Sequence, residues 1–233
     1  MRYAIAFLLG AAAAFPAQAQ DAAAAKTKAD PRDAKVLEAI AALKASDAKG
    51  ALAIVDPVIA SYERDYPASG RTVVCASDTS QMLMGLAGSA AARKDVVALN
   101  GSWCYALWAK GYALVELGRL EEAVAPLTRA TIMMPTNAQF LTELGYVHQT
   151  LKHWKESNAA YYAAIEAAKR NKDEASRNLS LRHAWFGIGY NDIELGNFDD
   201  AEKHMNEALK AAPDDQKVKE ELEYIRQRKG KRS

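Results

Sequence analysis

Residues 104–137 read CYALWAKGYALVELGRLEEAVAPLTRATIMMPTN and carry the clearest structural signal in the chain. Alanine, leucine and glutamate dominate this segment, and these residues favour helix, whereas the alternating β-branched pattern of strands is nearly absent. The same composition continues from residue 34 to the end of the chain, apart from an extended-looking stretch at residues 71–76. The sequence therefore predicts an all-α protein.

The same segment is repeated further along the chain. Gly111, Gly145 and Gly189 lie 34 and 44 residues apart. The same two steps relate Ala123, Ser157 and Ala201; Leu127, Tyr161 and Met205; Ala130, Ala164 and Ala208; and Pro135, Lys169 and Pro213. The chain thus contains three copies of a 34-residue unit, with ten extra residues between the second and the third.

The repeated unit resembles the tetratricopeptide repeat (TPR), whose pattern is an aromatic residue or Leu, then Leu-Gly, Ala, a large apolar residue, Ala and Pro. The matching positions are Leu107, Gly111, Gly118, Ala123, Leu127, Ala130 and Pro135 in the first copy; Leu141, Leu144, Gly145, Trp154, Ser157, Tyr161 and Ala164 in the second; and Trp185, Ile188, Gly189, Gly196, Phe198, Ala201, Met205, Ala208 and Pro213 in the third. The second copy departs from the pattern, with Lys152 in place of the glycine between its helices and Lys169 in place of the proline.

The resemblance implies a right-handed α-solenoid of antiparallel helix hairpins, a TPR superhelix, because one unit cannot bury its own apolar face. The expected units are residues 104–137, 138–171 and 182–215, and a ten-residue polar insertion near 170–181 is expected to lengthen the helices on either side of a loop. Residues 34–99 are expected to form an N-terminal helical region, with degenerate repeats as one possibility. Residues 214–233 form a C-terminal capping helix, with Val218, Leu222 and Ile225 on one face, and a basic tail.

The first nineteen residues have the pattern of an export signal. Arg2 precedes an apolar run at residues 4–14, and Ala17-Gln18-Ala19 fits the small-x-small cleavage motif. We expect a signal peptide at residues 1–19, cleavage after Ala19 and a periplasmic protein; the alternative is an apolar N-terminal helix kept in the fold. Residues 20–33 lack apolar periodicity and are expected to be a disordered tether.

Charge and cysteine content limit the partners. Cleavage of the expected signal peptide removes Arg2 and leaves 29 basic and 29 acidic residues, a net charge of zero. This balance argues against a nucleic-acid partner, which would require a basic surface. No segment reaches the roughly 20 apolar residues of a membrane span, so we expect no stable membrane insertion. Cys75 and Cys104 could form a disulfide in an oxidising compartment, but the sequence does not decide whether they lie within bonding distance.

A second stripe of residues runs along the first helix of each unit, beside the stripe that faces the core. It consists of Tyr105, Trp108 and Tyr112; Gln139, Thr142 and Tyr146; and His183, Phe186 and Tyr190. Seven of the nine are aromatic if His183 is counted, and exposed aromatic residues are typical of binding surfaces. The sequence favours a concave groove for another protein's extended, Pro-rich or apolar peptide, although these rings could instead pack against the superhelix's own inner wall. A carboxylate clamp is disfavoured, because the stripe has no Lys, Arg or Asn.

Other polar residues suggest no chemistry. His148 and Asp192 occupy equivalent repeat positions and could bond to each other or line the groove, whereas His153 and His204 have the pattern of surface residues. We predict a non-enzymatic adaptor of the bacterial cell envelope, with no catalytic residues, metal site or cofactor. The alternatives are a self-assembling structural subunit, or a small-ligand-binding protein or enzyme that uses the same groove. The oligomeric state is not predicted.

Overall fold

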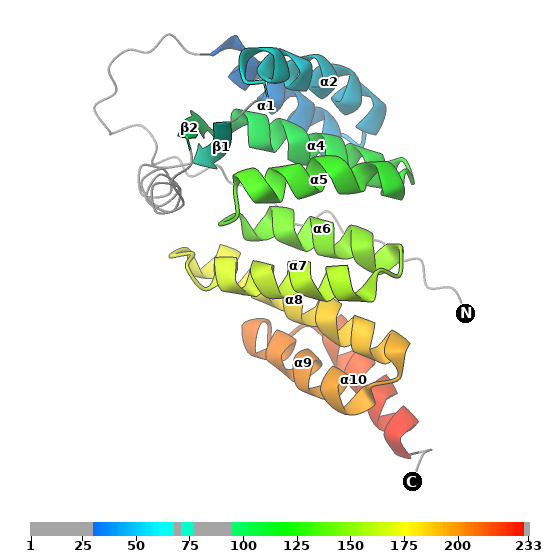
Figure 1. Cartoon of the computed structure of the whole chain (residues 1–233). Helices are drawn as coiled ribbons and strands as arrows, with labels where there is room; N and C mark the ends of the chain where they lie inside the picture. Colours follow the sequence, from blue (N-terminus) through cyan, green and yellow to red (C-terminus); the bar gives the residue numbers. More distant parts are fainter. Residues whose placement is uncertain (1–29, 68–70, 77–94, 231–233) are drawn as a thin grey trace.

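The computed structural model describes residues 30–67, 71–76 and 95–230. Within these ranges, pairs of antiparallel helices are stacked one upon another from α1 at one end to α10 at the other (Figure 1). The predicted all-α solenoid is therefore confirmed. The predicted signal peptide, and residues 20–29 of the predicted tether, lie outside the described residues.

The helix pairs after residue 100 follow the repeat. The first helices of the three units are α4 (Ser102–Glu116), α6 (Ala138–Thr150) and α8 (Glu174–Leu195). Their second helices are α5 (Leu120–Met133), α7 (Trp154–Ala168) and α9 (Phe198–Ala211). The solenoid ends with α10 (Gln216–Gly230).

An additional helix pair precedes these units. It consists of α1 (Pro31–Lys44) and α2 (Ala48–Asp65), which pack on each other and on α4. The prediction of a tether as far as residue 33 is wrong, because α1 already begins at Pro31. Asp30 caps this helix by accepting a 2.9 Å hydrogen bond from the Arg32 amide, and proline is favourable in a first helical turn. The alanine-rich composition concealed this start signal.

Small residues allow the two helices of each unit to pack closely. Ala164 and Ala208 are completely buried, as their in-phase repetition predicts. A Cβ atom added to Gly111 would lie 2.4 Å from Cγ of Leu127, and one added to Gly145 would lie 2.7 Å from the Tyr161 ring. The repeat positions are therefore set by steric contact between the paired helices.

The turns between paired helices differ among the units. Gly118 and Gly196 have φ values of 72° and 78°, in the left-handed region that glycine adopts readily. In the second unit Lys152 has a φ of 60°, so the same turn forms without glycine. The hairpin is retained at the cost of an unfavourable backbone conformation.

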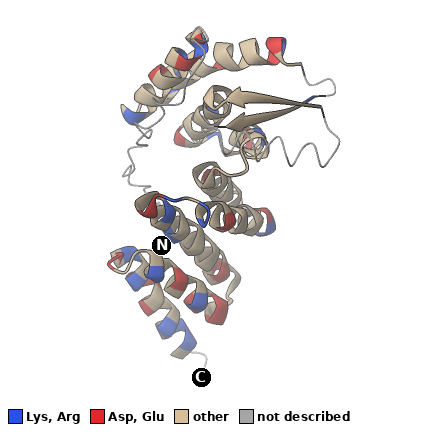
Figure 2. Ribbon diagram, turned by 90° about the vertical axis from the view of Figure 1, so that its left-hand side faces the viewer, with Lys and Arg blue, Asp and Glu red and all other residues tan. Residues whose placement is uncertain are grey.

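Two short strands interrupt the N-terminal region. β1 (Arg71–Ala76) pairs in parallel with β2 (Asp95–Asn100), and Figure 2 shows the two strands side by side. A wholly helical region at residues 34–99 is therefore wrong, because residues 95–99 form a strand. Parallel pairing with a segment distant in sequence gives no local periodicity to detect. Cys75 of β1 forms a disulfide with Cys104 of α4, with their Cα atoms 6.3 Å apart.

The ten-residue insertion extends one helix. α8 has 22 residues, against 15 in α4 and 13 in α6. Its new N-terminus is capped by Asp173, which accepts a 2.8 Å hydrogen bond from the Ser176 amide. We expected the helices on both sides of the insertion to lengthen, but only α8 does. The helix before it, α7, has 15 residues, close to the 14 of α5, its counterpart in the first unit.

The C-terminal helix covers the last unit. Val218, Leu222 and Ile225 of α10 are buried against the apolar face of α9. Figure 2 shows basic residues gathered near this end, and Lys229 is paired with Asp199 and Glu202 of α9 at 2.6 and 2.8 Å. Within the described ranges no helix has both the length and the apolarity needed to cross a membrane.

Candidate peptide-binding surface

The predicted stripe lies on α4, α6 and α8. Its most regular members are Tyr112, Tyr146 and Tyr190, each of which follows the glycine that contacts the paired helix. Because successive helical residues are separated by about 100°, a residue next to that glycine is turned away from the paired helix. All three tyrosines are partly exposed, and so are four other members of the stripe: Tyr105, Gln139, Thr142 and His183.

The central stripe residue of the first unit, Trp108, is internal. Trp108 is only 7% exposed and stacks on Phe140 of α6, with ring centroids 6.0 Å apart. Tyr105, which is partly buried, contacts the same phenylalanine edge-on at 5.2 Å. Burial raises the pKa of the Tyr105 phenol, and a hydrogen bond with Asn137 opposes this change. The interpretation of Trp108 as an exposed ring is therefore wrong, because Phe140 provides a buried partner between units.

The third unit is covered in a similar way. Phe186 is only 8% exposed, with the Arg182 guanidinium 4.8 Å and the Lys217 ammonium 5.1 Å from its ring centroid. Burial lowers the pKa of His183 to about 4, and the charge of Arg182 lowers it further. Arg182 is held by Asp215 at 2.6 Å. An exposed Phe186 is thus also wrong, because Arg182 of α8 and Lys217 of α10 lie over its ring.

The second unit contributes polar stripe residues. Gln139 and Thr142 are partly buried, and the Thr142 hydroxyl donates to the Gln139 carbonyl at 2.8 Å. With Trp108 and Phe186 buried, the aromatic members of the stripe that are partly exposed are Tyr105, Tyr112, Tyr146, His183 and Tyr190.

Two carboxylates flank the first of these tyrosines, and the sequence prediction missed them. Loss of hydration raises the pKa of Tyr112 to about 12, with further contributions from the charges of Glu143 and Glu116. Burial raises the pKa of Glu143 to about 7, and the charge of Glu116 adds to this effect. Neither carboxylate forms an ion pair within the described part of the chain. Their spacing offered a signal, since Glu116 lies four residues after Tyr112 and Glu143 three before Tyr146, on the same helix faces.

The third tyrosine has a similar environment. Burial raises the pKa of Tyr190, and the charges of Glu194 and Glu221 raise it further. The pKa of Glu221 is itself raised by burial, which the charge of Lys217 opposes. Tyrosines and carboxylates are thus found together on α4, α6 and α8 and on the adjoining α10.

The equivalent pair His148 and Asp192 does not interact. Asp192 instead contacts His204 of α9, with Oδ2 2.7 Å from Nδ1, and His204 stacks on Trp185 at 5.5 Å. The interpretation of His204 as an ordinary surface residue is therefore wrong. His148 lies 5.7 Å from the His153 ring, its Nδ1 has no hydrogen-bond partner, and burial lowers its pKa. Asp192 is satisfied within its own unit, so it does not bond across the repeat.

A buried polar network joins the second unit to the third. Gln149 Nε2 donates to the Gly187 carbonyl at 2.9 Å and to Asn191 Oδ1 at 2.7 Å. Asn191 Nδ2 donates to the Ser157 hydroxyl at 2.9 Å, and that hydroxyl donates to the Gly145 carbonyl, also at 2.9 Å. These groups satisfy one another inside the core, which assigns them a structural role.

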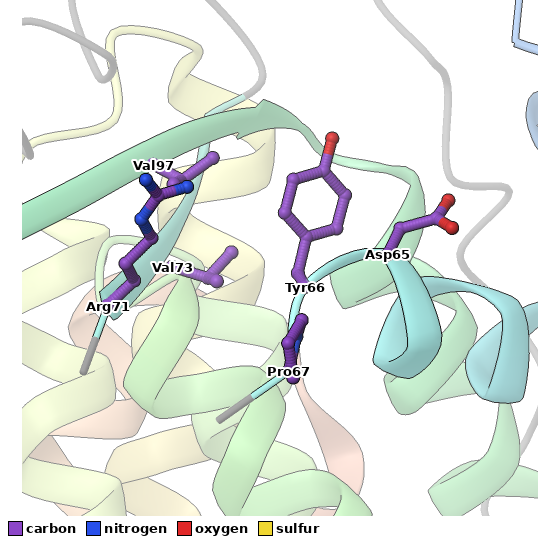
Figure 3. Close-up of a pocket in the computed structure, with 6 residues that line it drawn as sticks. All are labelled: Asp65, Tyr66, Pro67, Arg71, Val73 and Val97. Carbon is purple, nitrogen blue, oxygen red and sulfur yellow. The ribbon is translucent and has the colours of Figure 1, made fainter. Parts of the chain in front are cut away.

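A small pocket lies elsewhere, between the end of α2 and the strand pair (Figure 3). It is lined by Asp65, Tyr66, Pro67, Arg71, Val73 and Val97. The carboxylate of Asp65 is already paired with Arg32 at 2.7 Å, and the pocket shares no residue with the stripe. Among the described residues no group of three or more His, Cys, Asp and Glu side chains is arranged to hold a metal ion.

Comparison with known proteins supports the fold. Residues 183–215 match the family model described as tetratricopeptide repeat. No curated protein matches the chain. Among solved structures, the chain is similar to MamA 41-end from Desulfovibrio magneticus RS-1, with a TM-score of 0.58 and 15% identity over 88% of each chain. It is also similar to MamA MSR-1 C2, with a TM-score of 0.53 and 19% identity over 86% of this chain and 88% of that one. At such identities these similarities establish the solenoid fold alone.

Proposed function

We propose that this protein is a non-enzymatic adaptor that holds an extended peptide segment of another protein against the inner face formed by α4, α6 and α8. The observation that carries this proposal is the in-phase recurrence of Tyr112, Tyr146 and Tyr190, all partly exposed, on consecutive first helices. Trp108 is buried in contact with Tyr112, and Phe186 is buried in the cluster against which Tyr190 packs.

The physical basis is the low entropic cost of aromatic contacts. A tyrosine has few rotamers to lose, presents a large ring and retains a hydroxyl for hydrogen bonding. Tyrosine is also enriched among the residues that dominate interface energetics. Consecutive rings on stacked helices suit a peptide that runs along the stack in extended form.

The proposal includes export to the periplasm after cleavage at Ala19. The signal pattern of residues 1–19 supports this location. The bond between Cys75 and Cys104 supports it independently, because disulfides form and persist mainly in oxidising compartments. Mass spectrometry of the protein isolated from the cell envelope should find a mature chain beginning at Gln20; recovery of full-length chain from the cytosol would refute this location.

A photoreactive phenylalanine derivative at Tyr146 tests the binding surface. Crosslinking in the native envelope, followed by peptide mapping, should join position 146 to one defined segment of another protein. The matched control places the same group at Ala159, which is exposed on α7, and should not capture that segment. Equal capture by both positions would show that binding occurs elsewhere.

Substitution then separates binding from folding. Tyr112→Ala combined with Tyr190→Ala should weaken binding of the captured segment by about 2 kcal/mol or more. The melting temperature should fall less than in Leu141→Ala, because Leu141 is buried and the tyrosines are partly exposed. Unchanged binding in the double variant would contradict the proposed role of the tyrosines.

Self-assembly is the second candidate. The observation in its favour is Ile132 of α5, which is 70% exposed and could pack against another copy. Light scattering on the full chain distinguishes the two functions, since an adaptor is expected to remain monomeric without its partner. Dimers or larger species that dissociate in Ile132→Ser would favour the structural subunit.

A further inference from the structure

We infer that the turn between α6 and α7 binds a divalent transition-metal ion, with the imidazoles of His148 and His153 and the carboxylate of Glu156 as its protein ligands. This inference goes beyond the proposed peptide-binding function and does not depend on it. It replaces the expectation, drawn from the sequence, that the chain has no metal site. It is carried by the two imidazole rings, whose centroids lie 5.7 Å apart.

The backbone of the turn brings the two histidines together. The His153 amide donates to the His148 carbonyl at 2.8 Å, and Lys152 between them has a φ of 60°. A second bond runs from the Lys152 amide to the Gln149 carbonyl at 2.9 Å. This is the Schellman arrangement that ends many helices, and the side chains at the two ends of its longer bond frequently contact each other.

The equivalent positions of the other two units do not carry a histidine pair. The same backbone bond joins Arg119 to Leu114 and Asn197 to Asp192, each at 2.8 Å. The turn therefore forms without histidine, and the packing of the repeat does not explain why the second unit has two. Leu114 is only 2% exposed, so the first unit buries an apolar side chain at the position that His148 occupies.

The polar atoms of the pair lack partners. Nδ1 of His148 is buried and has no hydrogen-bond partner. Within the described ranges, no side-chain hydrogen bond or ion pair engages His148, His153 or Glu156. A buried polar atom without a partner lowers the free energy of unfolding. A rotation of the His148 ring about its side-chain bonds would bring a nitrogen to an ion shared with His153 and remove that cost, since neutral imidazole is a common metal ligand.

The separation of the rings suits one shared ion. Bonds between zinc and histidine nitrogen are about 2.0–2.1 Å long. Two imidazoles that share an ion in tetrahedral geometry therefore have ring centres roughly 5–6 Å apart. The observed separation of 5.7 Å lies within this range.

A carboxylate lies within reach of both rings. Glu156 is the third residue of α7, a position from which a carboxylate reaches back to the residue that precedes the helix, here His153. Burial lowers the pKa of His148 and the negative charge of Glu156 opposes this change, which agrees with a carboxylate near that ring. Glu156 is exposed, so a change of rotamer can bring it to the ion. Two imidazoles, one carboxylate and a water molecule form a ligand set that zinc accepts.

The site lies apart from the tyrosine surface. His148 follows Tyr146 by two residues, about 200° around α6, so it lies on nearly the opposite side of that helix. An ion there would join the end of α6 to the start of α7 across the turn that has Lys152 in place of glycine. Metal binding is therefore expected to stabilise the second unit without occupying the inner face.

Isothermal titration calorimetry of the untagged protein with zinc chloride tests this inference. We expect one ion per chain, and nickel should compete for the same site, whereas calcium and magnesium prefer oxygen ligands and should not bind. His148→Leu and His153→Asn should each weaken zinc binding at least about tenfold, because losing even a residue that supports a ligand costs about that much. Both replacements occur at the equivalent positions of other units, so the turn should remain folded. Glu156→Gln should weaken binding about threefold or more, because its amide is uncharged.

A control variant and a second readout locate the ion. His204→Gln removes another partly exposed imidazole and should leave zinc affinity unchanged. Saturating zinc should raise the melting temperature of the wild-type protein and slow hydrogen exchange at the α6–α7 turn. Zinc should do neither in His148→Leu, and circular dichroism confirms that each variant is folded.

Several outcomes would overturn the inference. Absence of zinc binding, or equal affinity in wild type and both histidine variants, would leave His148 and His153 as a packing contact. Equal affinity for calcium would indicate general attraction to surface carboxylates, and one ion per two chains would place the ion between copies. Unchanged affinity in Glu156→Gln would remove that residue from the ligand set. The crosslinking test at Tyr146 is independent of these results, so failure of this inference leaves the proposed function unaffected.

Discussion

The two junctions between the repeat units are built from different chemistry. Where α6 meets α4, the contact is apolar, and Phe140 is completely buried between Tyr105 and Trp108. Where α8 meets α6 and α7, Gln149, Asn191 and Ser157 form a buried hydrogen-bonded network beside the apolar contacts. Apolar side chains can pack favourably in many relative positions of two units. A buried polar network has all its hydrogen bonds formed in only a few of these positions. The comparison suggests that the first junction mainly provides stability and the second mainly fixes how the units are aligned.

The largest loss of stability should follow from truncating the buried ring at the apolar junction. Phe140→Ala removes a completely buried ring and should reduce the free energy of unfolding by about 3–5 kcal/mol. Urea titration followed by circular dichroism measures the loss, and Phe140→Leu should retain most of the stability. A loss below about 1 kcal/mol would show that this junction is not the main source of stability.

A smaller and more local effect should follow from opening the polar junction. Asn191→Ala leaves Gln149 and Ser157 with unmet hydrogen bonds and should cost about 2 kcal/mol. Hydrogen exchange should increase in α8 to α10 and remain unchanged in α1 to α5, because coupling in repeat arrays is between neighbours. The exposed Asn206→Ala serves as control and should change neither measurement. Uniformly faster exchange would mean that the network does not act locally.

A third effect concerns the apolar junction, where the charged form of Glu143 is expected to lower the free energy of unfolding. Glu143 lies near Glu116 and Tyr112 of α4 and near Tyr161 of α7. Its folded-state pKa is raised to about 7, so the folded protein retains a proton that the unfolded chain releases near pH 4.5. Stability attributable to this group therefore falls as pH rises from about 4.5 to 7.

Replacing this carboxylate should remove that pH dependence. Glu143→Gln should stabilise the protein at pH 8 by about 1–2 kcal/mol, a value reduced because Glu143 is only partly buried, and by much less at pH 4.5. Urea titrations of both proteins at the two pH values provide the measurement. An equal gain at both would assign the effect to packing rather than charge.

The smallest effect is expected in the turn of the unit that both junctions share. Lys152 has a φ of 60°, where glycine avoids the steric cost of a side chain. Lys152→Gly should therefore stabilise the protein by about 0.5–1 kcal/mol, after the greater entropy of the unfolded chain is subtracted. Ala159→Gly, at an exposed interior position of α7, should destabilise by a similar amount and provides the control. A loss of stability in Lys152→Gly would show that the turn is not strained.

The sequence was informative wherever a contact repeats. The steps between Gly111, Gly145 and Gly189 predicted the helix pairs correctly, because each glycine makes the same close contact with its paired helix. Pairing of β1 with β2 escaped detection because it occurs once and joins distant segments. The buried polar network was missed for a similar reason, since Gln149 and Asn191 bond across different repeat positions.

The candidate surface was only partly predictable. Periodicity correctly placed Tyr112, Tyr146 and Tyr190 beside the core, but it could not show that Phe140 covers Trp108. Exposure depends on the neighbouring unit, and the sequence of one helix does not contain that information. Glu143 was overlooked because a glutamate on a helix is usually solvated, and its burial depends on α4 and α7.

The bond between Cys75 and Cys104 also has a mechanical consequence. It joins positions 29 residues apart, so tension along the backbone passes through the sulfur atoms and bypasses the chain between them. At about 3.4 Å per extended residue, roughly 100 Å of contour length is withheld from a stretched molecule until the bond is reduced. A partner that pulls on the first hairpin would therefore transmit force directly to α4. The oxidised protein would behave as a shorter and stiffer tether than its sequence length implies.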